Sequence, residues 1–247
     1  MSSVQRAVRA GVLAAALATS VAGVLAGCAG GEITGPPEKE ESPGVVSLVA
    51  AESAPADGAT QVRIVAVVDS ALARDQRSVT FRTSAGTFPG GREVVVAADS
   101  ARTAVAVLTA PPDTMTAVIT ATAGGGTRRI EVRFVVALPD LIEVTTDQPS
   151  VTSGFTGSLT VTAALRRNPG VPTAGHVVAF EAHAPGEPQP HGRFSSETGL
   201  SDAAGRVSVR FTPADSVYAG PVVIVATAVG RTGVLRDSTV VQVVPPC

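Results

Sequence analysis

Residues 207–211 read Val-Ser-Val-Arg-Phe and place an apolar side chain at every second position. Residues 130–134, Ile-Glu-Val-Arg-Phe, repeat that pattern. A two-residue period with charged residues between apolar ones puts the apolar side chains on one face of a β-strand and does not fit a helix. From Val45 onward, similar runs alternate with Gly, Pro, Asp and Ser clusters roughly every 8–12 residues. The pattern predicts an all-β chain built from β-sandwiches.

The strand patterns occur twice, in the same order. Val79-Thr80-Phe81 corresponds to Val178-Ala179-Phe180, and the offset grows along the chain, as expected when loops carry insertions. Four further pairs are Phe88 and Phe194, Asp99 and Asp202, Leu108-Thr109 and Phe211-Thr212, and Ala121-Thr122-Ala123 and Ala226-Thr227-Ala228. The repeat predicts two units, residues 45–138 and 139–245, that meet near Leu138-Pro139-Asp140. Each has about the size of an immunoglobulin-like sandwich, roughly 100 residues.

The order of motifs resembles the group 1 bacterial immunoglobulin-like domain of invasin and intimin ectodomains. The carrying motifs are residues 62–69 (VRIVAVVD), 86–88 (GTF), 192–194 (GRF), 201–207 (SDAAGRV) and 223–228 (VIVATA). This resemblance implies two tandem immunoglobulin-like β-sandwiches displayed outside the cytoplasm. It also implies a role as a structural spacer or as an adhesion or protein-binding module.

Three departures from the pattern affect the expected structure. Arg102 stands where the second unit has Gly205, so we expect a different turn geometry in the first unit, because glycine tolerates a positive φ and arginine does not. The second unit has Arg166-Arg167-Asn168 where the first has Asp69. The chain contains no tryptophan and only two cysteines, so the cores are expected to rest on aliphatic and phenylalanine packing.

The N-terminus has the pattern of a secretory signal. Residues 1–10 carry two arginines and no acid, and an apolar stretch of about 14 residues follows, which is short for a membrane span. It ends at Leu25-Ala26-Gly27-Cys28, which resembles the bacterial lipoprotein box. The resemblance implies cleavage after residue 27 and lipidation of Cys28. The alternative is an ordinary signal peptide in which Cys28 is incidental.

The lipoprotein resemblance implies attachment to the cell envelope. Acyl chains on Cys28 would hold the protein to a membrane leaflet, since each buried methylene contributes about 0.8 kcal/mol. Ala29 after the cysteine favours the outer membrane over the cytoplasmic membrane, by a sorting rule that varies between organisms. Residues 28–44 are rich in Gly, Pro and charge and are predicted to form a flexible tether.

One group of residues has the composition of a metal site. His183, Glu187 and His191 are spaced four residues apart, and zinc accepts two histidines and a carboxylate in many sites. Three prolines between them exclude the helix that would align this spacing, so an exposed loop without a metal is the favoured interpretation. His176 precedes a strand and has no evident partner in the sequence. No cofactor is predicted.

No recognised catalytic motif occurs, so the chain is predicted not to be an enzyme. Gly124-Gly125-Gly126 is interpreted as a hairpin turn because strand residues follow it. The pairs Arg128-Arg129 and Arg166-Arg167 are expected to be solvated charges at turns or strand ends, with acidic glycans or lipid headgroups as alternative partners.

Composition and the last residue limit the partners. A formal net charge of −2 argues against nucleic-acid binding. Cys247 ends the sequence and is either idle or able to form an intermolecular disulfide. Besides the spacer or adhesion module, two functions stay open. One is an envelope accessory protein that binds a polysaccharide or a partner protein. The other, less favoured, is a metal-dependent enzyme that uses the His183/Glu187/His191 loop.

Overall fold

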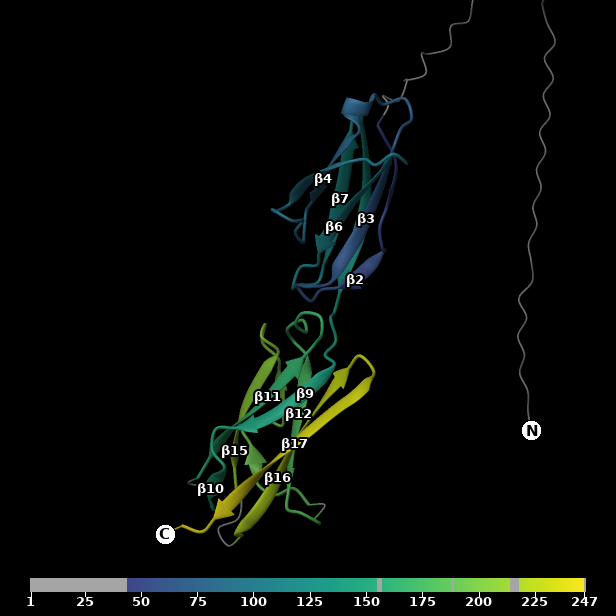
Figure 1. Ribbon diagram of the computed structural model, residues 1–247. Coiled ribbons are helices and arrows are strands. Elements are labelled where there is room, and N and C mark those ends of the chain that lie inside the picture. The colour runs from purple at the N-terminus through teal and green to yellow at the C-terminus, as the bar shows by residue number, and fades with distance from the viewer. Residues whose placement is uncertain (1–43, 155–156, 188, 214–217, 247) are drawn as a thin grey trace, which may run out of the picture. The chain divides into compact units, whose positions relative to one another are not determined.

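The computed structural model describes residues 44–154, 157–187, 189–213 and 218–246 (Figure 1). Within these ranges the chain forms strands and one short 3-10 helix, Arg74–Gln76, so the predicted all-β class is confirmed. This part of the chain contains no helix long and apolar enough to cross a membrane. The predicted signal peptide, the box Leu25-Ala26-Gly27-Cys28, the tether up to residue 43 and Cys247 lie outside the described residues.

The first sandwich packs a three-stranded sheet, in the order β1-β3-β6, against a five-stranded sheet, in the order β2-β8-β7-β4-β5. The strands are β1 (Val45–Val49), β2 (Ser53–Pro55), β3 (Gln61–Val68), β4 (Ser78–Thr83), β5 (Glu93–Ala97), β6 (Thr103–Thr109), β7 (Met115–Ala123) and β8 (Gly126–Val135). Alternate residues of both sheets fill the space between them, as the two-residue period predicts. The core includes the fully buried Ile64, Phe81, Leu108, Ile119 and Val132.

The second sandwich pairs a four-stranded sheet, in the order β13-β15-β11-β9, with a five-stranded sheet, in the order β10-β17-β16-β12-β14. The strands are β9 (Leu141–Thr146), β10 (Ser150–Thr152), β11 (Leu159–Arg166), β12 (Val177–His183), β13 (Arg193–Phe194), β14 (Thr198–Leu200), β15 (Arg206–Thr212), β16 (Gly220–Gly230) and β17 (Gly233–Val244). Phe211, at the end of the 207–211 pattern, is completely buried in this core.

The two sandwiches repeat each other in strand order and in register. Phe81 of β4 faces Ala121 of β7, and Phe180 of β12 faces Ala226 of β16. In each sandwich a short strand, β2 or β10, pairs in parallel with the last strand. The internal repeat read from the sequence is therefore confirmed at the level of individual residue pairs.

The turn before β6 and the turn before β15 have the same geometry, so the expected difference between them is wrong. The side chain of Asp99 accepts a hydrogen bond from the Thr103 N–H, and Asp202 accepts the equivalent bond from Arg206, both at 2.8 Å. Arg102 has φ 64° and Gly205 has φ 74°. The hydrogen bonds around this turn hold Arg102 in the left-handed conformation that glycine adopts without cost.

Replacing Arg102 with glycine is expected to stabilise the first sandwich by about 1 kcal/mol, because it relieves a left-handed conformation that costs an L-residue about 1–2 kcal/mol. The greater freedom of glycine in the unfolded chain offsets part of this gain. Urea denaturation followed by circular dichroism measures the change.

Gly205→Ala is the matched substitution in the second sandwich, and we expect it to destabilise. Its Cβ would lie 2.6 Å from the Leu165 carbonyl oxygen, at an unfavourable φ. An Arg102→Gly variant with the same free energy of unfolding as wild type would contradict the inferred strain at Arg102.

The glycine run is a hairpin turn, as predicted. Gly124 has φ 53°, and Ala123 of β7 faces Gly126 of β8 across the turn. Strand residues follow it and no helix begins there, so this segment does not form a phosphate-binding loop.

Candidate functional site

The structure does not assemble His183, Glu187 and His191 into a metal site. His183 ends β12, Glu187 is exposed in the following turn, and the ring of His191 packs on Tyr218 with a centroid distance of 3.9 Å. The His191 Nε2 is buried and has no hydrogen-bond partner among the described residues. No group of three or more His, Cys, Asp or Glu residues in these ranges could hold a metal ion. The spacing of four therefore reflects a loop and not a preformed ligand set.

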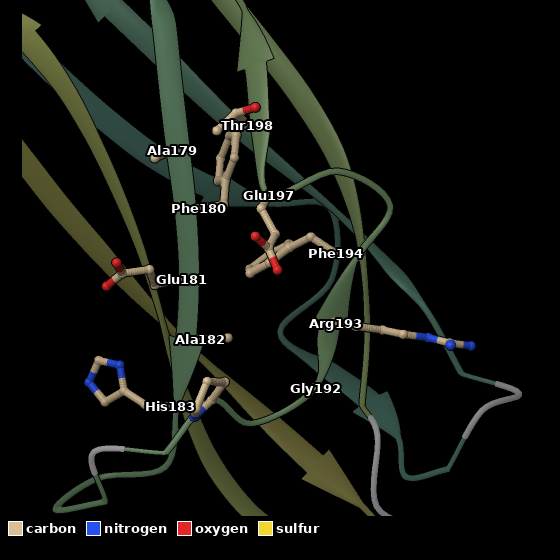
Figure 2. Close-up of a pocket in the computed structure, with 11 residues that line it drawn as sticks. Ala179, Phe180, Glu181, Ala182, His183, Gly192, Arg193, Phe194, Glu197 and Thr198 are labelled. Atoms are coloured by element: carbon tan, nitrogen blue, oxygen red, sulfur yellow. The ribbon is translucent and has the colours of Figure 1, made fainter.

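A cavity of about 510 Å³ lies in the second sandwich, between β12 and the segment that runs through β13 to β14 (Figure 2). The aromatic rings of Phe180 and Phe194 line it with centroids 5.8 Å apart, and Glu197 and Thr198 contribute polar groups. In Figure 2, Phe194 and Glu197 point into the space between β12 and β13. Glu181 also borders the cavity, but its side chain points away from that space.

The cavity exists because the edge strand of the second sandwich is short. In the first sandwich, β5 pairs with β4 over five residue pairs, from Ser78 to Arg82. In the second, β14 pairs with β12 over only three pairs, from Val177 to Ala179. The chain before β14 leaves this sheet and forms β13, which pairs with β15 of the other sheet. The space opens where the edge strand is missing.

A second feature that the sequence did not reveal is an ion pair between the two sandwiches. Asp57, in the loop between β2 and β3, accepts a hydrogen bond from the Arg167 Nε at 3.1 Å. The side chains are 0% and 6% exposed, respectively. Arg167 also donates from Nη1 to the Leu138 carbonyl oxygen at 2.7 Å, so its guanidinium joins the first sandwich to the linking segment. Arg167 is thus not the solvated charge that we expected.

Both oxygens of the Asp57 carboxylate accept hydrogen bonds. Burial by itself would raise the pKa of Asp57, but this effect is outweighed by hydrogen bonds from the Thr60 hydroxyl and N–H, the Ala59 N–H and Arg167. These bonds hold the pKa of Asp57 below its usual value. The carboxylate is therefore charged at neutral pH despite its burial.

Comparison with known proteins identifies the fold. No family model and no curated protein matches the chain. The crystal structure of invasin, a bacterial integrin-binding protein, is 21% identical and matches with a TM-score of 0.57 over 81% of this chain and 40% of its own. The adhesin InvE of Yersinia pseudotuberculosis is 22% identical, with a TM-score of 0.45 over 83% of this chain and 61% of its own. The D0-D1 domain of intimin is 19% identical, with a TM-score of 0.33.

Three observations together decide the fold: the invasin match, the strand order and the repeated register. The chain has the immunoglobulin-like fold of invasin. The predicted class, two tandem immunoglobulin-like β-sandwiches, is thereby confirmed. This chain spans only about two fifths of the invasin structure and three fifths of the InvE structure.

Backbone contacts fix the linking segment of this invasin-like pair. The Ala137 carbonyl oxygen accepts a hydrogen bond from the Thr173 N–H at 3.2 Å. The same oxygen lies 3.1 Å from the His176 Nε2. His176 thus has a partner that its sequence context did not disclose. The Arg231 N–H donates to the Pro139 carbonyl. Three successive residues of the segment, 137–139, therefore have their carbonyl groups bonded to the second sandwich.

The backbones of the two sandwiches also approach each other closely at this junction. The Val171 N–H donates to the Asp57 carbonyl oxygen at 3.0 Å. Gly170 has φ 81°, and a Cβ there would collide with the same oxygen. Only glycine meets both demands, a left-handed backbone and direct contact with the first sandwich. The basic pair's other member, Arg166, forms an exposed ion pair with Glu143.

Proposed function

We propose that this chain is a lipid-anchored bacterial envelope protein. In this proposal Cys28 carries the lipid, residues 28–44 form the tether, and residues 45–138 and 139–245 form the displayed domains. They act as a spacer that presents a protein-binding or adhesive surface. The anchor is supported by the match of all four residues of the box to the lipoprotein pattern and by the apolar stretch before it.

The buried Asp57–Arg167 pair is the observation that carries the spacer role. Two domains on a chain move independently unless a substantial interface joins them. Here a buried ion pair and a bonded linking segment join the sandwiches. Buried ion pairs contribute more to defining one arrangement than to net stability, in some systems. A junction held by these contacts suits a protein that must hold its distal domain away from a membrane.

The adhesive part of the proposal draws support from the fold. Invasin is described as a bacterial integrin-binding protein, and it shares the sandwich fold with this chain. The absence of a metal cluster among the described residues leaves no specific observation in favour of the enzymatic alternative. A binding surface on the second sandwich would be displayed outside the cytoplasm.

Replacing Cys28 with alanine is expected to move the protein from the membrane fraction to the soluble fraction. The substitution removes the only sulfur in the box, and with it the acyl chains whose burial would hold the protein to the leaflet. Fractionation of cells expressing the full chain, followed by immunoblotting, measures the distribution. Cys247→Ala is the matched control, since it removes the other thiol and should leave the protein in the membrane fraction. Membrane retention of the Cys28→Ala protein would refute the anchor.

A further inference from the structure

We propose that the cavity between β12 and β13 binds the cationic side chain, lysine or arginine, of a partner protein. The inference rests on the protein-binding role proposed above and specifies the site and the chemistry of its ligand. The residues that carry it are Phe180, Phe194 and Glu197.

Aromatic rings form the inner wall of the cavity. Phe194 lies between two buried phenylalanines, with ring centroids 5.8 Å from Phe180 and 5.3 Å from Phe211. Phe194 itself is half-buried and lines the cavity. The face of an aromatic ring attracts a cation placed over it, and the apolar stem of a lysine or arginine packs on such a surface.

A carboxylate supplies the complementary charge. Glu197 is exposed, lines the cavity and points into it together with Phe194 (Figure 2). It has no ion-pair partner among the described residues. Arg193 also lines the cavity, but its guanidinium points away from Glu197 in the same view. A cation between the rings and Glu197 would meet attraction from both, whereas an anion would be repelled.

The cavity is held open by backbone hydrogen bonds on its rims. The Phe180 N–H donates to the Glu197 carbonyl at 2.8 Å, and the His191 N–H donates to the Ala182 carbonyl at 2.8 Å. On the opposite side the Ser195 N–H donates to the Arg210 carbonyl at 2.7 Å. A ligand therefore finds the site preformed. Its volume, about 510 Å³, lies in the range of small-ligand pockets, about 300–1,000 Å³.

The first sandwich shows that the fold does not need an acid at this position. Phe81 pairs with Val94 of β5, and Val94 packs against the first core. By register, Gly199 faces Val178 as Val96 faces Val79, which places Glu197 where the first sandwich has Val94. Valine at this position closes the sandwich edge. The glutamate of the second sandwich is thus free of a packing role and available to a ligand.

The test is retention of the full, detergent-solubilised chain on agarose that carries a lysine side chain with a free ε-ammonium. Elution uses N-acetyl-lysine methylamide at constant ionic strength, and N-acetyl-norleucine methylamide serves as the uncharged probe. We expect the wild-type protein to be retained and to elute with the cationic probe only. Glu197→Gln should weaken retention by about fivefold, which corresponds to about 1 kcal/mol.

Glu181→Gln is the matched control, because Glu181 also borders the cavity and carries the same charge, but its side chain points away from the space beside Phe194 and Glu197. It should leave retention unchanged. Glu197→Val, which installs the residue of the first sandwich, should abolish retention while preserving the melting temperature.

Three results would overturn the proposal: no retention of wild type, equal loss in Glu197→Gln and Glu181→Gln, or elution by the norleucine probe. None of them bears on membrane fractionation, so failure of this site and failure of the anchor are distinguishable.

Discussion

Replacing Arg167 with alanine is expected to lower the free energy of unfolding by about 3–5 kcal/mol, because it leaves the buried carboxylate of Asp57 without its countercharge. The Leu138 carbonyl would lose its donor in the same step. Urea denaturation of the full chain at pH 7, followed by circular dichroism, measures the loss.

Arg166→Ala is the control for this prediction. Arg166 is the adjacent residue and also forms an ion pair, but its side chain and that of Glu143 are 55% and 51% exposed. Exposed pairs contribute about 0–1 kcal/mol, so this variant should remain close to wild type. The double variant Asp57→Asn/Arg167→Met should recover part of the loss, since it removes both charges. Equal effects of Arg166→Ala and Arg167→Ala would contradict a special role for the buried pair.

The hydrogen bonds that Asp57 accepts, from Thr60, Ala59 and Arg167, make its contribution to stability depend on pH. The pKa of Asp57 in the folded chain is below its usual value, so its contribution to stability is present above the unfolded pKa of about 3.9. That contribution is lost as the pH falls through the lower, folded pKa. The difference between wild type and Asp57→Asn should therefore be full at neutral pH and shrink in acid.

Replacing Phe211 with alanine is expected to destabilise the second sandwich by about 3–5 kcal/mol, the usual cost of removing a large buried ring. Phe211 is 0% exposed, pairs with Leu159 of β11 and contacts Phe194. The truncation would leave a cavity in the core of the second sandwich. Thermal unfolding of the variant measures the change.

Ser208→Ala, on the outward face of the same strand, is the matched control and should change stability by less than about 0.5 kcal/mol. Ser208 is exposed and contacts Thr162 across the strands. A Phe211→Ala protein that melts like wild type would contradict the placement of the ring in the core.

Local patterns were enough to predict the strands and their duplication. Val207 and Val209 are buried while Arg206 and Arg210 are exposed, because alternation along a strand directly sorts side chains between core and solvent. The correspondence between Asp99 and Asp202 could also be read from the sequence. In the structure, each side chain accepts a hydrogen bond within the turn that precedes β6 or β15, respectively.

Features that depend on contacts distant in the sequence could not be predicted. Arg167 resembled a solvated charge because its partner, Asp57, lies 110 residues away along the chain. An arginine at position 102 predicted a turn without a positive φ. Hydrogen bonds nevertheless hold Arg102 at a positive φ, including one from the Val68 N–H to the Arg102 carbonyl. The cavity follows from where the chain leaves one sheet for the other, near Glu197, and no periodicity records such a departure.

The packing of Tyr218 on His191 has a spectroscopic consequence. The chain has one tyrosine and no tryptophan, so light absorbed near 280 nm excites essentially this residue alone. Its hydroxyl donates to the Pro221 carbonyl at 2.6 Å, and its ring packs against the His191 imidazole at an interplanar angle of 55°, so the surroundings of the ring change when the second sandwich opens. Tyrosine emission from the protein therefore reports on the second sandwich, because the first sandwich contains neither tyrosine nor tryptophan. Comparison of tyrosine emission with circular dichroism, which averages both domains, shows which sandwich a given substitution has destabilised.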